Sequence, residues 1–334
     1  MATARLHANE SPYPMSPLAV RAAGAALERC ERYPDPGSPD LRRALAEHYR
    51  VDPAMVAVGS GSIELILAAC RAWTVGRRPV AVTRPGFPGY AMMARLAGAP
   101  VYEVACDGLR IDVPAMVRAL PEAGCAFVCN PLNPTGAVLE PDELRALVEG
   151  SNCTGAVLLI DEAYAEFAGP RLPSGIGEIR AGGDAIVLRT FSKAYGMAGL
   201  RIGYAIGPAE LIAQLGRWRA PFSVSRPAQA AAAAALADRA YLDDVVGRVS
   251  EGRRRLADGL AELGLDVAGG HANFVVVSAP EGAAQLAAGL EARSLLVQDL
   301  AEFGLPGHIR ITVGTPAQNT ALLHAMADLV AVRR

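Results

Sequence analysis

The chain has 334 residues, of which 51% are hydrophobic and 20% are charged, and its formal net charge is -2. This composition excludes an intrinsically disordered chain, and the length allows one large domain with a sizeable core and a smaller second domain. The nearly neutral charge excludes the electrostatic signature of a protein that binds nucleic acid or an anionic membrane surface.

The N-terminal residues 1–9, MATARLHAN, lack the apolar core of a signal peptide. The longest apolar stretch, residues 228–237, contains Gln229 and is too short to cross a bilayer. The six cysteines include no CxxC pair, so they are expected to be small buried side chains in a reducing compartment and not zinc ligands. We therefore expect a cytoplasmic protein without a metal site.

From about residue 55 to residue 206, short β-rich runs alternate with helical patterns. The runs do not alternate in polarity and are bounded by Gly or Pro, which indicates a mainly parallel sheet covered on both faces. The predicted strands are 55–58, 80–83, 101–104, 126–129, 157–160, 186–190 and 203–206. This pattern predicts an α/β domain with a seven-stranded sheet.

The sequence after residue 207 predicts a separate, smaller α+β domain. A predicted helix at about 226–263 is too long to be straight without a bend. The other predicted elements are helices at 208–218 and 282–293 and strands at 274–278, 295–297 and 309–313. We expect a large domain at 41–244 and a discontinuous small domain at 1–40 and 245–334, unless the N-terminal stretch bridges the two.

The candidate catalytic group is Lys193, which follows a predicted strand and Ser192 in the segment TFSKAYGMAGLRIGY (190–204). This position places it on a rim loop, where α/β sheets bind their ligands. A lysine amine attacks an aldehyde once burial or nearby cations lower its pKa. Arg201 can hold a phosphate, with Ser192 donating a hydroxyl hydrogen bond. A Ser-Lys pair alone is usually solvated surface, whereas the whole pattern is specific.

Asp161 stands at the end of the predicted strand 157–160, in the motif DEAY. A buried carboxylate is unfavourable unless it meets a cation, and a pyridinium nitrogen is such a cation. Tyr164 can donate to a phenolic 3-oxygen of the same ring. The alternative is a helix N-cap Asp followed by an ordinary aromatic residue.

Three further motifs can contact the same ligand. Asn133, in the turn NPLNPTG (130–136), can present its amide to the phenolic oxygen, although this composition also makes plain turns. GSGS (59–62) can close backbone N–H groups on a phosphate or simply cap a helix. Phe87 can stack on the ring or belong to the core.

Taken together, these groups fit pyridoxal 5'-phosphate (PLP). Lys193 would bond to its aldehyde, and Asp161 would pair with the ring nitrogen. The expected catalytic residues are Lys193, Asp161 and Tyr164. The remaining cofactor contacts are Asn133 and Tyr164 at the 3-oxygen, Phe87 on the ring, and Ser60, Gly61, Ser62, Ser192 and Arg201 around the phosphate.

The chain resembles the fold-type I PLP enzymes of the class I and II aminotransferase group, and within it the histidinol-phosphate aminotransferase family. The resemblance runs nearly from end to end of the chain. It is carried by HANESPYP (7–14), RYPDP (32–36), GSGS, NPLNPTG, DEAY, TFSKAYGMAGLRIGY, HANF (271–274) and RITVGT (310–315).

The resemblance implies a homodimer whose active sites lie at the interface. Tyr33 would reach the cofactor phosphate of the partner subunit, and Tyr13 would contact the partner's substrate. In the chain's own site, Arg310 would hold the acidic tail of the substrate, with Asn9 and Gln298 as further substrate contacts. The alternatives are a packing tyrosine for Tyr13 and a surface ion pair for Arg310.

The sequence departs from the family pattern at three places. Gln298 stands where a second arginine is usual, and losing one charge-assisted contact to a phosphate costs about 1.5–3 kcal/mol. A carboxylate-bearing donor therefore competes with a phosphate ester. Phe87 and Phe222 stand where tyrosine is common, and the chain begins almost at the HANESPYP motif, without the family's short leader.

These features predict an aminotransferase of amino-acid biosynthesis that moves an amino group from histidinol phosphate, or a related amino acid, to a 2-oxo acid such as 2-oxoglutarate. The rival enzymes are an aromatic or specialised amino-acid transaminase, a decarboxylase like the threonine-phosphate decarboxylases, a racemase and an oxidase. An effector-binding PLP-fold module is disfavoured, because the N-terminus has no basic helix-turn-helix segment.

Overall fold

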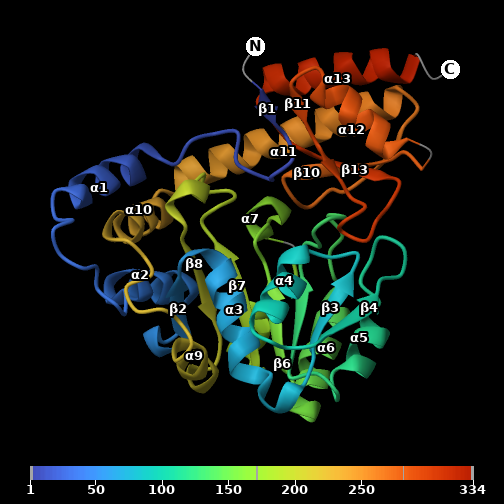
Figure 1. Cartoon of the computed structure of the whole chain (residues 1–334). Helices are drawn as coiled ribbons and strands as arrows, with labels where there is room; N and C mark the ends of the chain where they lie inside the picture. Colours follow the sequence, from blue (N-terminus) through green and yellow to red (C-terminus); the bar gives the residue numbers. More distant parts are fainter. Residues whose placement is uncertain (1–2, 171, 281, 332–334) are drawn as a thin grey trace.

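The computed structural model describes residues 3–170, 172–280 and 282–331 (Figure 1). Its centre is a seven-stranded sheet with the order β2-β8-β7-β6-β5-β3-β4. All neighbours from β4 to β7 pair in parallel, and β8 is antiparallel to β2 and β7. The strands are β2 (Val56–Gly59), β3 (Val80–Arg84), β4 (Val101–Ala105), β5 (Cys125–Cys129), β6 (Val157–Asp161), β7 (Ala185–Thr190) and β8 (Gly203–Ile206). The predicted mainly parallel sheet is confirmed, with every strand within one residue of its predicted bounds.

The central strands are mainly apolar because helices cover both faces of the sheet, whereas the edge strand β4 is mostly exposed and contains Glu103. Every residue of β5, β6 and β7 is buried. Helices α3 and α4 pack together on one face, and α5, α6 and α8 form the layer on the other (Figure 1). The helices of this part are α2 (Pro39–Tyr49), α3 (Gly61–Trp73), α4 (Pro88–Leu96), α5 (Val113–Ala119), α6 (Pro141–Thr154), α7 (Ala165–Ala168), α8 (Gly175–Arg180) and α9 (Ala209–Gly216). The catalytic motifs lie in the turns that connect these two kinds of element.

The C-terminal part contains an antiparallel sheet with the order β12-β13-β10-β9. Its strands are β9 (Asp266–Ala268), β10 (Phe274–Ser278), β12 (Gln298–Asp299) and β13 (His308–Thr312). Its helices are α11 (Arg239–Glu262), α12 (Ala283–Glu291) and α13 (Pro316–Ala331). The predicted smaller α+β unit is therefore present, although β9 and α13 were not predicted.

The long predicted helix at 226–263 is broken, as its length required. It consists of α10 (Arg226–Ala237) and α11, and Asp238 between them leaves the helical conformation, with φ -88° and ψ 65°. The Asp238 side chain accepts a hydrogen bond from the Tyr241 N–H and so caps the second helix. The predicted strand 295–297 is also divided, into β11 (Leu295–Leu296) and β12.

The N-terminal stretch joins the two hydrophobic cores. Strand β1 (Ala4–Arg5) pairs with β11, and Leu6 belongs to the smaller core. Helix α1 (Pro17–Leu27) packs against α10 and buries Ala19 in the larger core. The stretch thus bridges both cores, and the exact domain limits stay a prediction.

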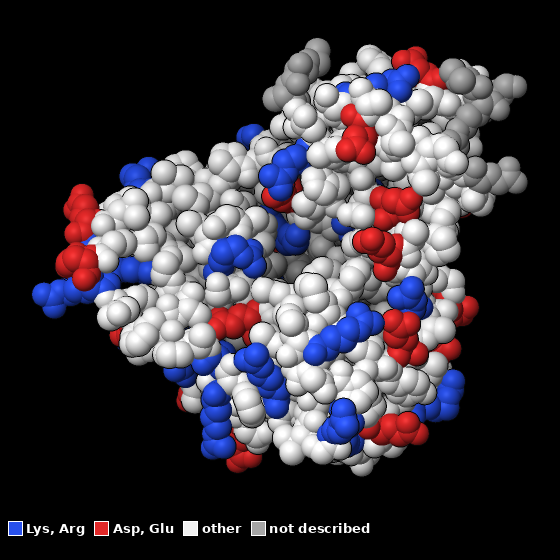
Figure 2. Space-filling view, in the orientation of Figure 1, with Lys and Arg blue, Asp and Glu red and all other residues white. Residues whose placement is uncertain are grey.

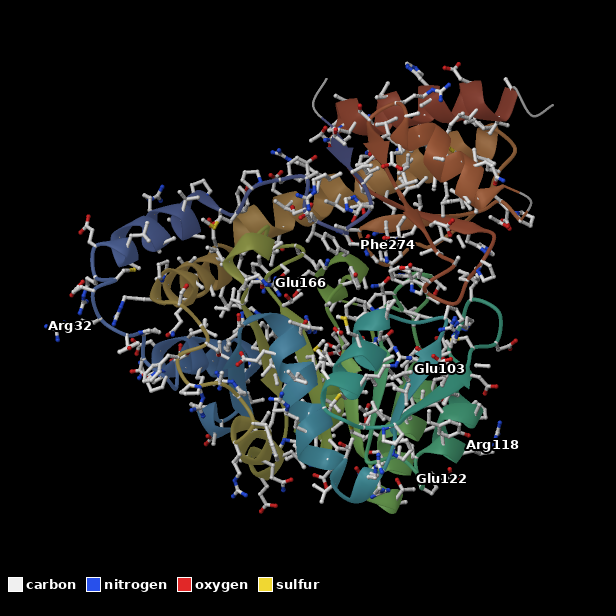
Figure 3. All side chains as sticks on the ribbon, in the orientation of Figure 1. Arg32, Glu103, Arg118, Glu122, Glu166 and Phe274 are labelled. Atoms are coloured by element: carbon white, nitrogen blue, oxygen red, sulfur yellow. The ribbon has the colours of Figure 1, made fainter. Side chains whose placement is uncertain are left out.

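The two cores meet below a hollow. Phe274 of β10 (Figure 3) belongs to the larger core. Its ring meets the Tyr164 ring edge-on, with the centroids 5.4 Å apart. Figure 2 shows the hollow between the upper and lower parts, with basic side chains at its rim. No helix among the described residues has the length and apolar character needed to cross a membrane.

Candidate active site

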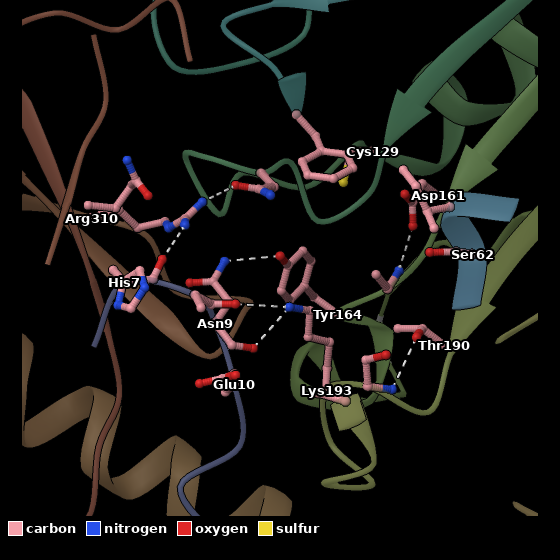
Figure 4. Close-up of a pocket in the computed structure, with 18 of the residues that line it drawn as sticks. His7, Asn9, Glu10, Ser62, Cys129, Asp161, Tyr164, Thr190, Lys193 and Arg310 are labelled. Atoms are coloured by element: carbon pink, nitrogen blue, oxygen red, sulfur yellow. Dashed lines mark hydrogen bonds between the residues drawn. The ribbon is translucent and has the colours of Figure 1, made fainter. Parts of the chain in front are cut away.

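A cavity of about 680 Å³ occupies the hollow between the two parts (Figure 4). Its walls come from the N-terminal segment, from the turns after the strands of the large sheet, and from β12 and β13. Most of the predicted site residues share this one cavity: Asn9, Ser62, Phe87, Asn133, Asp161, Tyr164, Ser192, Lys193, Arg201, Gln298 and Arg310. The predicted convergence of separate turns is therefore present in the structure.

Lys193 lies in the loop that follows β7, and it is the only lysine in the sequence. Its Nζ donates to the carbonyl oxygens of Asn9 at 3.0 Å and of Ala8 at 3.3 Å. Burial, with a contribution from the charge of Arg310, lowers the pKa of Lys193 to about 8. About one fifth of this amine is therefore neutral at pH 7.4, far more than for a lysine of ordinary pKa, and the neutral form is the one that a nucleophile or proton acceptor requires.

Asp161 ends β6 and is 4% exposed. Its carboxylate accepts hydrogen bonds from Tyr90 Oη at 2.8 Å and from the Ala163 N–H at 3.1 Å. Burial raises the pKa of Asp161 to about 6, against the effect of these two donors. Among the described residues, no cationic side chain forms an ion pair with it. A buried carboxylate with this environment fits a ligand that brings its own cation.

Tyr164 and Asn133 approach the same cavity from different turns. Asn9 Nδ2 donates to Tyr164 Oη at 3.0 Å, and burial raises the pKa of this phenol above its usual value. Asn133 follows β5, and its Oδ1 accepts from Arg310 Nη1. Both side chains are buried, so their polar groups are held in fixed directions by these partners.

Arg310 comes from β13 and lies at the end of the cavity away from Asp161 (Figure 4). It is 3% exposed, and its guanidinium lies over the rings of Phe303, at 4.9 Å, and Phe274, at 5.3 Å. Burial lowers its pKa to about 10, so it remains a cation at neutral pH. Gln298 pairs with Arg310 across β12 and β13 and lines the same end of the cavity.

A cradle for an anion lies at the opposite end, where α3 begins. Gly61 has a φ of +72°, and a Cβ atom there would stand 2.3 Å from Arg201 Nη2. The absent side chain therefore leaves room for the guanidinium beside the helix N-terminus. Arg201 Nη1 also donates to Ser192 Oγ at 3.4 Å, and Ser62 lines the cavity beside them. This donor set fits a phosphate group.

These three regions have the complementarity that PLP requires. An amine with a lowered pKa, an anion cradle and a buried carboxylate without an ion-pair partner among the described residues line one cavity, and Phe87 lines its wall as well. The residues present therefore fit the cofactor on geometric and electrostatic grounds.

Residues 4–326 match the family described as aminotransferase class I and II. The chain belongs to the class I and II aminotransferase family. The predictions of a fold-type I PLP enzyme, of an aminotransferase and of its cofactor are thereby confirmed.

Individual relatives agree with this assignment. The histidinol-phosphate aminotransferase of Jannaschia sp. (strain CCS1) is 36% identical over 332 residues, which cover 98% of this chain and 91% of that protein. The crystal structure of histidinol-phosphate aminotransferase from Sinorhizobium meliloti in complex with pyridoxal-5'-phosphate has a TM-score of 0.88 and 30% identity, and the match covers 100% of this chain and 92% of that chain. Aspartate aminotransferase from Thermus thermophilus with maleate has a TM-score of 0.88 at 26% identity, with 98% and 92% covered.

Four of the expected cofactor or substrate residues do not line the cavity of this aminotransferase, and one of them is Gly61, which lies beside Arg201 at the anion cradle. Tyr33 is 80% exposed, and its ring contacts the Phe222 ring in a tilted arrangement with the centroids 5.1 Å apart. Tyr13 lies in a different crevice, under the guanidinium of Arg248. The Ser60 N–H donates to Glu64 Oε2 at 2.5 Å, so it is not directed at the cradle.

The aminotransferase cavity also contains residues without a predicted role. Tyr90 hydrogen-bonds Asp161, Thr190 Oγ1 accepts from the Ser192 N–H at 3.0 Å, and Phe303 packs under Arg310. The other added lining residues are His7, Ala8, Glu10, Ile63, Met92, Cys129, Ala163, Ala198 and Gly199. The sequence contained one indication that Tyr90 lies near the site. It follows the expected stacking residue Phe87 by three positions at the start of a helix, and side chains three positions apart lie on the same face of a helix.

Proposed function

We propose that this aminotransferase takes the amino group of histidinol phosphate, or of a closely related donor, and passes it to a 2-oxo acid such as 2-oxoglutarate, in amino-acid biosynthesis. The observation that carries the proposal is the buried Arg310 guanidinium, which faces the cavity at the end away from the phosphate cradle. A fixed cation at the far end of the cavity from the phosphate cradle suits the anionic end of a substrate. The Jannaschia relative, which covers 98% of the chain, carries the matching name.

Pyridoxal phosphate, when bound, supplies an aldehyde that takes up the amino group and a ring that accepts electrons from the substrate α-carbon. Arg201, Ser62 and Ser192 would hold its phosphate, and Asp161 would hold a proton at its ring nitrogen. Asn133 and Tyr164 would contact its 3-oxygen, and Phe87 would cover one face of the ring.

Lys193 has the central role among the residues of the chain. In its neutral form, the amine would accept the proton from the substrate α-carbon. In its protonated form, it would then donate that proton again, and so act as general base and general acid in turn. A pKa near 8 suits both directions of transfer at neutral pH. Arg310 orients the donor by its anionic end, and the buried walls exclude water from the reacting atoms.

A second class of donor is favoured by one observation. Gln298 is a neutral amide beside Arg310, and its Nε2 donates to the Asp299 carbonyl at 2.8 Å. A single guanidinium suffices for a carboxylate, whereas a phosphate dianion gains from a second cation. Aromatic or specialised amino acids are therefore the alternative donors.

The donor is identified by mixing the PLP-loaded enzyme with one amine at a time, without a 2-oxo acid, and recording conversion of the cofactor to its pyridoxamine form. We expect the fastest conversion with histidinol phosphate. Gln298→Arg should raise its kcat/KM relative to phenylalanine by about 10- to 100-fold, because it adds one charge-assisted contact. Release of carbon dioxide without amino transfer would exclude transamination, and faster reaction of phenylalanine in the unaltered enzyme would favour the second class.

We further propose that the enzyme is a cytoplasmic homodimer whose partner subunit completes each site. Tyr33 and Phe222 form an exposed aromatic pair, and α1 exposes Leu18, Val20 and Leu27. Tyr33→Ala should weaken PLP binding although Tyr33 lies outside its own cavity. Sedimentation of the holoenzyme is expected to give twice the chain mass, and a fully active monomer would refute the dimer.

A further inference from the structure

Tyr90 connects the two groups that would contact the cofactor ring. It lies on the first turn of α4 and is fully buried. Its hydroxyl donates to Asp161 Oδ2 at 2.8 Å, across 71 positions of sequence. A buried hydroxyl is unfavourable without a partner, and packing alone would be served by phenylalanine. The hydroxyl is therefore explained by its bond to Asp161.

The ring of Tyr90 makes a second connection, to Phe87. The two rings meet edge-on at 5.3 Å with an interplanar angle of 88°. On the other side, Tyr90 stacks on Phe127 at 4.9 Å and 9°, which fixes the plane of its ring. A Cβ at position 89 would stand 2.3 Å from Phe87 Cε1, so Gly89 provides the space in which the Phe87 ring lies. Phe87 thus lies against a ring whose own plane is fixed, in the space that Gly89 leaves.

We propose that Tyr90 is a positioning residue for the cofactor ring: its hydroxyl holds the Asp161 carboxylate at the ring nitrogen, and its ring holds Phe87 at the ring face. The inference rests on the proposed function, because it requires the pyridine ring to contact both residues. Tyr90 acts through its two neighbours and takes no part in proton transfer to the substrate.

The hydroxyl also determines the charge state of Asp161. The titratable groups that face this carboxylate are Tyr90, Cys129, Glu162, Tyr164 and Lys193. Among the described residues, Tyr90 is the only side chain that hydrogen-bonds it. Burial favours the protonated acid, and the Tyr90 hydroxyl favours the carboxylate. Loss of this donor therefore raises the pKa of Asp161 and draws the shared proton from the ring nitrogen toward the carboxyl group.

The test compares the unaltered and Tyr90→Phe holoenzymes, loaded with PLP that carries ¹⁵N in its ring. In Tyr90→Phe, the ¹⁵N resonance should move toward the position of neutral pyridine. The acid limb of the kcat/KM profile should move up by about one to two pH units, the range expected for one hydrogen bond to a charged group. The variant keeps its ring and hence the contacts with Phe87 and Phe127, so we expect it to fold.

Tyr204→Phe is the matched control, because Tyr204 is also fully buried and its hydroxyl bonds Tyr49 Oη at 2.6 Å, outside the cavity. It should leave both readouts unchanged. In an Asp161→Asn background, Tyr90→Phe should cause little further change in the ¹⁵N resonance, because the carboxylate through which the hydroxyl acts is absent.

Each contrary result has its own meaning. Identical ¹⁵N positions and acid limbs in the unaltered and Tyr90→Phe enzymes would overturn the role of Tyr90 and leave the proposed function intact. Equal shifts in Tyr204→Phe would also overturn it, by revealing a general response of the core. An unaltered protein that binds no PLP would refute the proposed function, and this inference with it.

Discussion

Lys193→Ala is expected to abolish amino transfer, with kcat lowered by about 10⁴-fold, the upper range for loss of a general acid–base group. The side chain supplies both the amine that bonds the cofactor aldehyde and the base for the α-proton. Its burial and its pKa near 8 suit both tasks. The measurement is single-turnover conversion of the bound cofactor with the best amine donor.

A feature of the sequence makes this experiment unusually specific. Because Lys193 is the only lysine, borohydride can fix the cofactor to a side-chain amine at no other position. Treatment should attach PLP covalently to the unaltered enzyme and leave Lys193→Ala unlabelled except at the chain N-terminus. Methylamine should restore part of the rate, because it fits the space that the side chain leaves. An undiminished rate in Lys193→Ala would end the proposed mechanism.

The parts of the fold predicted most accurately are those with strong local signals. The central strands of the large sheet are short apolar runs bounded by Gly or Pro, and such runs are typical of strands buried on both faces. Strand β9 escaped prediction because it has three residues, none of them fully buried, at the edge of the small sheet. Strand β9 forms by pairing with β10, and the local sequence does not predict this pairing.

The site divides in the same way. Lys193, Asp161 and Asn133 stand at or just beyond strand ends, and parallel strands bring their carboxyl ends to one edge of a sheet, so their convergence was predictable. The contact between Tyr90 and Asp161 depends on how α4 packs, which sequence spacing does not determine. The expected contacts of Tyr13 and Tyr33 lie in the partner subunit, so these two side chains point to no group of their own chain's site.

The buried Asp161 carboxylate is the second group on which activity depends. Asp161→Asn should still bind PLP through Lys193 and the phosphate cradle, because the amide keeps the shape of the side chain. Its kcat should fall by about 10²- to 10³-fold, the range for removing one preorganised electrostatic contact. Asp112→Asn is the matched control, because Asp112 caps α5 by accepting from the Ala115 N–H, outside the cavity. Near-normal kcat in Asp161→Asn would remove Asp161 from its role.

Asp161→Asn should lower the activity of the holoenzyme but raise the folding stability of the apoenzyme. This combination distinguishes a role in binding the cofactor ring from a role in supporting the fold. The pKa of Asp161 is about 6 in the folded chain, against an ordinary value of 3.8 that is expected in the unfolded chain, so the folded protein binds more protons between these values. The stability contributed by the protonated acid is complete below about pH 4 and is lost as pH rises through 6. Above pH 6, cofactor-free Asp161→Asn should therefore be more stable than the unaltered apoenzyme, by roughly 3 kcal/mol for two pKa units. Urea unfolding at pH 4 and pH 8 measures this difference. Because PLP supplies the missing cation, loading with the cofactor should reduce the advantage of the variant, whereas a carboxylate that only supported the fold would make Asp161→Asn less stable at every pH.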